Sequence, residues 1–255
     1  RLLARGVRVL YFDHHHAGAI PRDPLLEAHI ETVPGVCTSM LVDRHLGGRF
    51  RAWAVAAAFG DNLAGSAAEL ARTLALEPAA LDALRVLGEA LNYNAYGETG
   101  ADLTIAPARL FERMRGFADP LRFAAEDPIV RQLADAKGVD LVAARAVAAS
   151  QYDARAALYV LPDAAWSRRV MGIFANHLAT AAPGRAHAVL ARNRRLGYTV
   201  SVRAPLAQPE GADAFCRQFS TGGGRAGAAG IEHLPEADLD RFAGRFMQAP
   251  WGGPR

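Results

Sequence analysis

One aspartate followed by three histidines, Asp13 to His16, offers the side chains best suited to metal chemistry in this chain. The run directly follows an apolar stretch, Val7 to Phe12, which predicts a short buried strand. Ligands of open α/β sheets bind beyond the carboxyl ends of the strands, so we expect these side chains at such a position. A carboxylate beside imidazoles suits first-row divalent metals, and a turn with ordinary hydrogen bonds is the alternative.

A second candidate is Gly60-Asp61-Asn62, which ends the very apolar segment from Arg49 to Phe59. That segment predicts a helix, and Gly60 permits a sharp turn that would project the Asp61 carboxylate from a buried scaffold. The same tripeptide is also a common way to stop a helix. Taken alone, the motif therefore leaves both a metal ligand and a plain turn open.

The third candidate is the glycine-rich stretch from Gly222 to Gly230. Successive glycines leave backbone amides uncovered, and such amides can form an anion-binding concavity. Arg225 within the stretch and Arg203, near the end of a predicted strand, add guanidinium groups that bind phosphate bidentately. A flexible linker and an exposed arginine without a role are the alternatives.

Composition excludes several classes of protein. Of the 255 residues 51% are hydrophobic, enough for a sizeable core, and the net charge of +3 is too small to indicate a duplex nucleic-acid binder. Two distant cysteines, Cys37 and Cys216, fit neither a disulfide framework nor a metal-binding spacing, so we expect a reducing, cytoplasmic setting. No apolar segment is long enough to span a bilayer, so no membrane partner is expected.

The elements that must position these residues change in character along the chain. The first part is expected to be mostly helical after a loop marked by Pro21 and Pro24. Helices are predicted over Cys37 to Gly48, Arg49 to Phe59, Ser66 to Leu76, Pro78 to Gly97, Asp102 to Met114 and Asp127 to Ala149. Asp43 and His45 are expected at the surface of the first of these helices.

From residue 153 onward, strands return. The pattern predicts strands over Ala154 to Pro162, Ala186 to Asn193 and Tyr198 to Pro205, the last two joined by a tight turn. Helices are expected after an Asp163 cap, over Asp213 to Phe219, and around Leu239 to Met247, with the glycine-rich stretch as a loop.

In this order, the Asp-His-His motif, the Gly-Asp-Asn turn, and a Ser-x-Arg strand followed by GGGRAGAAG resemble the DHH phosphoesterase superfamily. The C-terminal part is similar to the associated DHHA1 domain. The resemblance implies an α/β fold: the C-terminal portion of a DHH-type parallel-sheet domain with many helices, then a smaller α/β DHHA1 domain with a mixed sheet. We expect the first domain over residues 1–125, a helical connector over 126–152, and the second domain over 153–255.

The resemblance also implies roles for the first two motifs. It implies a two-metal site, usually occupied by Mn²⁺, in which His14 and Asp61 hold one ion. His15 would contact the scissile phosphate or orient groups around it, and Asp13 would hold an imidazole in place, as metal-bound histidines generally require. His16 is an extra histidine beyond the motif and receives no role.

In the DHHA1 part, the resemblance implies that the substrate phosphate or nucleotide is held by Arg203, Gly222, Gly223, Gly224 and Arg225. The family usually has histidine at position 225. Arginine keeps the positive charge but cannot act as a proton donor, which puts an acid role there in doubt.

The chain departs from the family pattern at its start. The motifs that supply the other metal's ligands and a bridging aspartate should precede the Asp-His-His motif by tens of residues, yet only about a dozen residues stand before Asp13. Two-metal hydrolysis needs both ions, about 4 Å apart. We therefore expect half of the metal cluster, either in a fragment of a longer enzyme or in an inactive relative.

The function implied is hydrolysis of small phosphodiesters, such as short oligonucleotides or cyclic dinucleotides, in a cleft between the two domains. Alternatives are a pyrophosphate or polyphosphate hydrolase and an inactive nucleotide-binding relative. An aromatic side chain near the glycines that could stack on a base would favour a nucleotide as substrate. Phe219 and Tyr198 are candidates, and burial in the core is the equal alternative for both. The expected partner is a small phosphate-containing substrate, short single-stranded oligonucleotides included, and a homodimer is left open.

Overall fold

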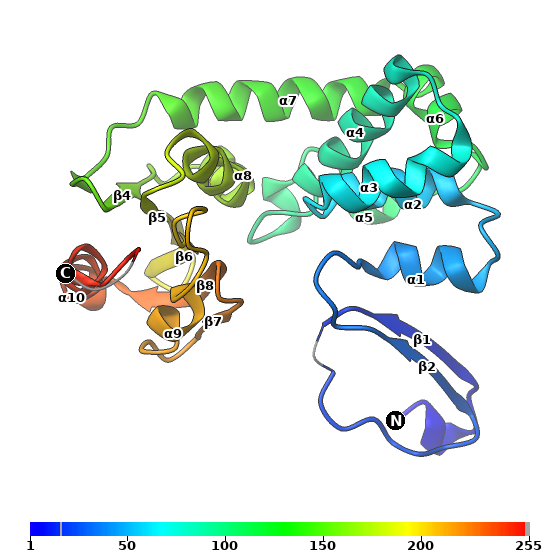
Figure 1. The fold of residues 1–255 in the computed structure, drawn as a ribbon, viewed down its shortest axis with the longest axis horizontal. Helices are drawn as coiled ribbons and strands as arrows, with labels where there is room; N and C mark the ends of the chain where they lie inside the picture. The colour runs from blue at the N-terminus through cyan, green and yellow to red at the C-terminus, as the bar shows by residue number, and fades with distance from the viewer. Residues whose placement is uncertain (16, 253–255) are drawn as a thin grey trace. The chain divides into compact units, whose positions relative to one another are not determined.

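The computed structural model describes residues 1–15 and 17–252 (Figure 1). The chain forms two compact units, one of Arg1–Asn92 and Pro107–Ala134, the other of Tyr93–Ala106 and Asp135–Arg255. The first unit holds a parallel two-stranded sheet with many helices, and the second holds a six-stranded mixed sheet. This mixed α/β architecture confirms the predicted class, whereas the expected boundaries at residues 125 and 152 stay predictions.

The sheet of the first unit pairs β1 (Val9–Asp13) with β2 (Leu26–Ile30) in parallel, in register from Val9 with Leu26 to Asp13 with Ile30. Strand β1 was predicted, but β2 was not: its sequence LEAHI alternates apolar and polar residues as a strand does, yet the two prolines before it favour a loop. Parallel strands end at the same edge of a sheet, so Asp13 lies at the carboxyl edge of the pair.

Helices make up most of the rest of the first unit. They are α1 (Thr38–His45), α2 (Arg51–Gly60), α3 (Ala64–Ala71), α4 (Pro78–Tyr93), α5 (Pro107–Met114), α6 (Pro120–Glu126) and the start of α7 (Pro128–Arg145). Helix α3 begins two residues before Ser66, so the predicted serine cap is wrong. Helix α6 was not predicted; its cap is Asp119, whose side chain accepts a hydrogen bond from the Leu121 amide.

Glycine lets α2 and α4 approach each other closely. A Cβ atom built on Gly88 of α4 would lie 1.8 Å from the carbonyl oxygen of Ala56, and one on Gly60 would lie 2.7 Å from the carbonyl oxygen of Gly88. Only glycine fits where two backbones are this close. The end of α2, and with it Asp61, is therefore fixed against α4.

The second unit is built on a sheet with the strand order β3-β4-β5-β6-β8-β7. Only β4 and β5 are parallel neighbours, connected through helix α8, and every other pair is antiparallel. The strands are β3 (Gln151–Tyr152), β4 (Ala156–Val160), β5 (Ala186–Asn193), β6 (Gly197–Arg203), β7 (Gly222–Gly224) and β8 (Ala228–Pro235), and the helices are α8 (Ala165–Ala181), α9 (Ala212–Cys216) and α10 (Leu239–Gln248). Short 3₁₀ segments span Leu3–Arg5, Arg72–Leu74, Gly100–Asp102 and Glu236–Asp238.

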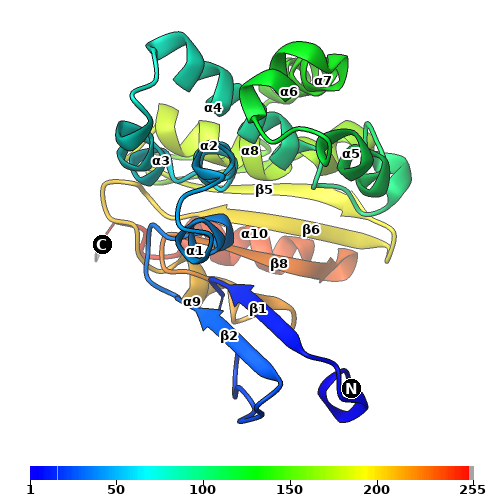
Figure 2. The same ribbon diagram turned by 90° about the vertical axis from the view of Figure 1, so that its right-hand side faces the viewer.

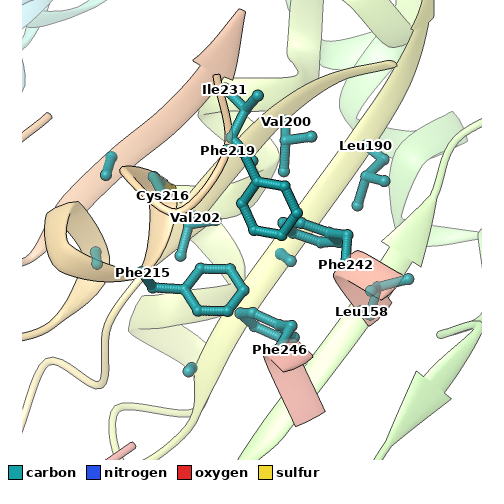
Figure 3. Packing of buried hydrophobic residues seen from close by; sticks show 14 of the residues in the cluster. Leu158, Leu190, Val200, Val202, Phe215, Cys216, Phe219, Ile231, Phe242 and Phe246 are labelled. Carbon is teal, nitrogen blue, oxygen red and sulfur yellow. The ribbon is translucent and has the colours of Figure 1, made fainter. Parts of the chain in front are cut away.

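Both faces of this sheet are covered (Figure 2). On one face the rings of Phe215, Phe219, Phe242 and Phe246 from α9, α10 and the turn after α9 gather over the strands (Figure 3). On the other face α8 places Val170 and Phe174 against Val189. Burial of this apolar surface, at about 25 cal/mol per Å², is the main stabilising term of the unit.

Polar networks complete the second unit. Arg169 on α8 donates to the Asp140 carboxylate, at 2.8 Å, and to the Tyr93 hydroxyl, at 2.7 Å. Burial, with the hydrogen bond to Asp140, raises the pKa of Tyr93 to about 12. The predicted cap of α8 is wrong: the helix begins after Ala164, and the Asp163 carboxylate instead pairs with Arg168 at 2.8 Å. Within the described residues, no helix is long and apolar enough to cross a membrane.

Candidate functional site

Asp13 organises the turn that follows β1. Its Oδ1 accepts hydrogen bonds from the backbone amides of His14, at 2.7 Å, and His15, at 3.0 Å. Its Oδ2 accepts one from the Tyr11 hydroxyl, at 2.6 Å. The Tyr11 bond first, and then those from His15, hold the pKa of the Asp13 carboxyl well below its usual range. Asp13 is thus a fixed anion at the carboxyl edge of the sheet.

Tyr11 is a site residue that the sequence reasoning missed. Strand geometry gives the missing signal, because residues two apart on a strand lie on the same face. Tyr11 and Asp13 have this spacing, so their contact could have been expected once β1 was assigned.

The same aspartate holds the His15 imidazole. His15 Nδ1 lies 2.9 Å from Asp13 Oδ1, and the His15 side chain is 71% exposed. A carboxylate only accepts, so Nδ1 carries the proton of this bond and Nε2 is left for another partner. Of the two histidines in the motif, Asp13 positions His15, and a backbone carbonyl positions His14.

His14 turns inward and meets Asp61. Its Nδ1 lies 2.8 Å from the carbonyl oxygen of Val36 and 3.8 Å from Asp61 Oδ2, which is too long for a hydrogen bond. The carbonyl of Val36 fixes the proton on Nδ1 and leaves Nε2 bare, as in metal-bound histidines. The 3.8 Å distance joins Asp61 to the Nδ1 side of the ring, whereas Nε2 is the nitrogen left open to a metal. An imidazole and a carboxylate in one place are a donor set that fits a divalent cation. His16 lies outside the described residues.

A cavity of about 520 Å³ within the first unit adjoins this pair. Besides His14 and Asp61 its walls are largely apolar and aromatic, with Phe50 and Trp53 among them, and they include Asp43. Apolar walls with a few polar groups among them are typical of small-molecule sites.

Asp43 corrects an expectation, since it was predicted at the surface and is only 3% exposed. Its Oδ2 accepts from Arg51 Nε at 3.1 Å, whereas Oδ1 is buried and has no hydrogen-bond partner among the described residues. The cause is tertiary: α2 packs against α1 and brings Arg51 over the carboxylate. His45, the last residue of α1, is exposed as expected.

In the second unit, Arg203 ends β6 with its guanidinium largely buried. Nε donates to Asn176 Oδ1 of α8, at 2.6 Å, and one terminal nitrogen donates to Ser201 Oγ, at 2.9 Å. Among the described carboxylates none forms an ion pair with it. Burial lowers the pKa of Arg203, and the nearby Arg225 charge lowers it further.

Strand pairing explains why the two arginines are close. Arg203 pairs with Ala228 across β6 and β8, and the backbones of Arg225 and Ala228 exchange hydrogen bonds at 2.9 and 3.2 Å. The described hydrogen-bond partners of Arg203 are all neutral, so none of the described carboxylates balances its charge. Two guanidinium groups this near each other would therefore bind an anion from outside the chain.

The glycines differ from the expected loop, because Gly222–Gly224 form the edge strand β7, paired with β8. A Cβ on Gly222 would lie 1.8 Å from the carbonyl oxygen of Cys216, so Gly222 is needed for packing against α9. A Cβ on Gly223 would meet nothing within 4 Å. An edge strand keeps one row of unpaired backbone groups, but the Gly222 amide already donates to the carbonyl oxygen of Phe219, at 2.9 Å, and is not open to an anion.

The two aromatic residues considered for base stacking are both in the core. Tyr198 is 4% exposed and Phe219 is 5% exposed. Arg192 covers the ring of Tyr198 and Arg241 that of Phe219, at 4.7 and 5.2 Å from the ring centroids. Neither ring offers a free face to a nucleobase.

Neither a protein-family model nor a curated protein matches this chain. Among solved structures, the chain is similar to an exopolyphosphatase-related protein from Bacteroides fragilis, with a TM-score of 0.44 and 16% sequence identity. The match covers 94% of this chain and 63% of that protein, so the chain spans less than two thirds of its length. A likeness at this score carries no argument about function, which therefore rests on the residues themselves.

Proposed function

We propose that this chain is part of a metal-dependent phosphoesterase that acts on small phosphodiesters, such as short oligonucleotides or cyclic dinucleotides. The observation that carries the proposal is the approach of His14 and Asp61, two side chains distant in sequence, to 3.8 Å beside a cavity in the first unit. The resemblance to the DHH phosphoesterases assigned both residues to one metal, and this geometry supports that assignment.

In this proposal, His14 Nε2 and the Asp61 carboxylate hold a divalent cation such as Mn²⁺. When bound, such an ion activates water and stabilises charge on phosphate oxygens. The Val36 carbonyl fixes the tautomer of His14, and Asp13 holds His15 at the exposed end of the turn. With its Nδ1 held by Asp13, the His15 ring presents Nε2 at the exposed end of the turn, where a donor to a phosphate oxygen would stabilise developing charge.

The second unit supplies the phosphate grip. Among the described residues, the Arg203 guanidinium donates to neutral groups, namely the side chains of Asn176 and Ser201 and the carbonyl oxygens of Val202 and Gly172. The exposed Arg225 lies near it. We assign these two arginines and the backbone of Gly223 and Gly224 to the binding of a substrate phosphate. Asn176 and Ser201 hold Arg203 in place.

The cavity beside His14 favours an organic substrate over inorganic polyphosphate. Its apolar walls match the face of a nucleobase, which a polyphosphate chain lacks. The polyphosphate hydrolase and the inactive nucleotide-binding relative remain the alternatives that the experiment must separate.

The test is a turnover assay of the full-length protein with Mn²⁺ on a dinucleotide, with pyrophosphate and polyphosphate in parallel. The variants are Asp61→Asn and, as matched control, Glu126→Gln, which alters an exposed ion pair on α6. We expect cleavage of the dinucleotide only. Mutation of a residue that hydrogen-bonds to a metal ligand typically lowers activity roughly 10–100-fold, and Asp61→Asn, which alters a ligand itself, should lower the rate of cleavage by more.

Three outcomes would contradict the proposal. Faster cleavage of pyrophosphate or polyphosphate would favour the inorganic alternative. Dinucleotide binding without turnover would favour the inactive relative. Equal turnover by the wild type and Asp61→Asn would remove Asp61 from the site.

A further inference from the structure

The first unit has a second group of metal-binding side chains, separate from His14 and Asp61. Glu27 and His29 lie on β2, and His45 is the last residue of α1. One ligand atom from each lies within 4.8 Å of the others. We propose that these three residues bind a zinc-like divalent cation at the side of β2 that α1 covers.

Backbone geometry places the three ligands together. Glu27 and His29 are two residues apart on a strand and so share one face. His29 Nε2 lies 2.8 Å from Glu27 Oε1, so the imidazole and carboxylate already meet. His45 approaches from the helix that packs on this face. The site thus draws on two rigid elements, the arrangement that holds ligands most accurately.

The two imidazoles are held by ring contacts. His29 stacks on Phe12 of β1, with centroids 4.7 Å apart and planes at 9°. His45 stands edge-on to both rings, at 5.2 Å from Phe12 and 5.1 Å from His29. Ligands held in this way lose little rotamer entropy when an ion binds.

Local charges also favour a cation. The C-terminal end of a helix carries partial negative charge, and His45 stands at that end of α1. Glu27 adds a full negative charge. Arg44, the nearest cation on the helix, is paired with Glu31 at 2.7 Å, which offsets its repulsion.

The donor set selects the metal. Two imidazoles and one carboxylate suit Zn²⁺, Co²⁺ or Ni²⁺ better than Mn²⁺, which binds such sites more weakly. Three protein ligands leave the fourth tetrahedral position of Zn²⁺ for water or another ligand. The ion would tie β2 to the end of α1, and this inference does not depend on the proposed hydrolase function.

The experiment uses Co²⁺ as a spectroscopic probe and Zn²⁺ as competitor. We expect one equivalent of Co²⁺ to give the intense visible absorption of a four-coordinate site, and Zn²⁺ to abolish it. His45→Ala should remove the absorption, and Glu27→Gln should weaken Co²⁺ binding about tenfold or more. The matched control is His177→Ala, an exposed histidine of the second unit.

Two further variants separate this site from the Asp-His-His turn. Asp61→Asn and His15→Ala should keep the full Co²⁺ signal, whatever they do to hydrolysis. The proposal is wrong if His45→Ala retains the signal, if His15→Ala loses it, or if the wild type gives no such absorption. Circular dichroism of His45→Ala checks that the variant is folded.

Discussion

The two sheets of this protein are held in place in different ways. In β5 of the second unit, Ala188, Val189 and Leu190 are each 0% exposed. In β1 of the first unit, Leu10 is 51% exposed and Tyr11 is 38% exposed. An isolated two-stranded sheet is marginally stable. The strand that carries the candidate metal ligands therefore relies on polar contacts and on α1, whereas the second sheet relies on its apolar core.

The charged residues show this contrast only in part, because Arg185 Nε and His187 Nδ1 in the second unit are also buried without a hydrogen-bond partner among the described residues. In the second unit, Asp140 and Arg169 satisfy each other inside the structure. In the first unit, Asp43 Oδ1 has no partner among the described residues, and His14 meets Asp61 at a distance too long for a hydrogen bond. Buried polar groups are normally paired, so unpaired ones near a cavity indicate a ligand. We expect substitutions in the second unit to change stability most and those in the first unit to change binding.

The largest effect on stability should come from Arg169→Leu. Removing this arginine leaves Asp140, whose side chain is 6% exposed, as an uncompensated buried charge. The expected loss is about 3–5 kcal/mol in the free energy of unfolding, measured by urea denaturation. As control, Arg122→Ala removes an exposed ion pair with Glu126 and should cost less than about 1 kcal/mol. Similar losses in both variants would contradict the contrast.

His187 on β5 should make the second unit sensitive to acid. The side chain is 1% exposed, and burial, aided by the Arg185 charge, lowers its pKa to about 4. Its pKa in the unfolded chain is near 6.5, so between these values the unfolded state binds more protons. Stability should be complete above pH 6.5 and fall by about 3 kcal/mol as the pH drops to 4.

The measurement is a series of urea denaturations between pH 4 and pH 7.5, for the wild type and His187→Gln. The variant cannot take up the proton, so its stability should vary less over this range. Equal pH dependence in both proteins would show that His187 is not the group responsible.

The neighbouring glycines Gly222 and Gly223 separate packing from binding. Gly222→Ala forces a methyl group toward the Cys216 carbonyl and should cost about 1–3 kcal/mol in thermal or urea unfolding. Gly223→Ala adds its methyl in open space and should change stability by about 0.5 kcal/mol or less. If β7 binds the substrate phosphate, Gly223→Ala should still weaken phosphate binding measured by calorimetry. Unchanged phosphate binding would show that Gly223 is not part of the proposed phosphate site.

The smallest effect concerns the turn after β1. Tyr11→Phe removes the hydrogen bond to Asp13 Oδ2, the largest cause of the low pKa of that carboxyl. The pKa of Asp13 should therefore rise toward its usual range, while the fold is kept. Carboxyl carbon shifts in an NMR titration report this directly, and an unchanged Asp13 pKa would show that the hydroxyl does not contact it in solution.

Much of the architecture could be predicted from local sequence signals. The apolar run of β1, the alanine-rich α2 and the hairpin of β5 and β6 all lie close to the predicted ranges. The approach of His14 and Asp61 followed from a resemblance in motif order, since no local pattern reports a contact between distant residues. The local sequence thus predicted the turn that carries His14 and the helix end that carries Asp61, but it could not predict the distance between them in the fold.

The errors share a physical cause, which is that tertiary packing overrides local pattern. Strand β2 is only five residues long, and it was missed although LEAHI alternates apolar and polar residues; it forms by pairing with β1. Gly222–Gly224 become an edge strand because β8 pairs with them. Asp43 is buried because Arg51 of the next helix neutralises it. Each depends on a partner elsewhere in the chain.

The central claim is that His14 and Asp61 bind one cation between them. Electron paramagnetic resonance of free Mn²⁺, titrated into the chain in a His45→Ala background, measures this directly. We predict about one Mn²⁺ per chain, with affinity about tenfold or more lower in His14→Ala and in Asp61→Asn. The double variant should bind Mn²⁺ no more tightly than the weaker-binding single variant, because both residues serve the same ion. Unchanged Mn²⁺ binding in either single variant would contradict the account.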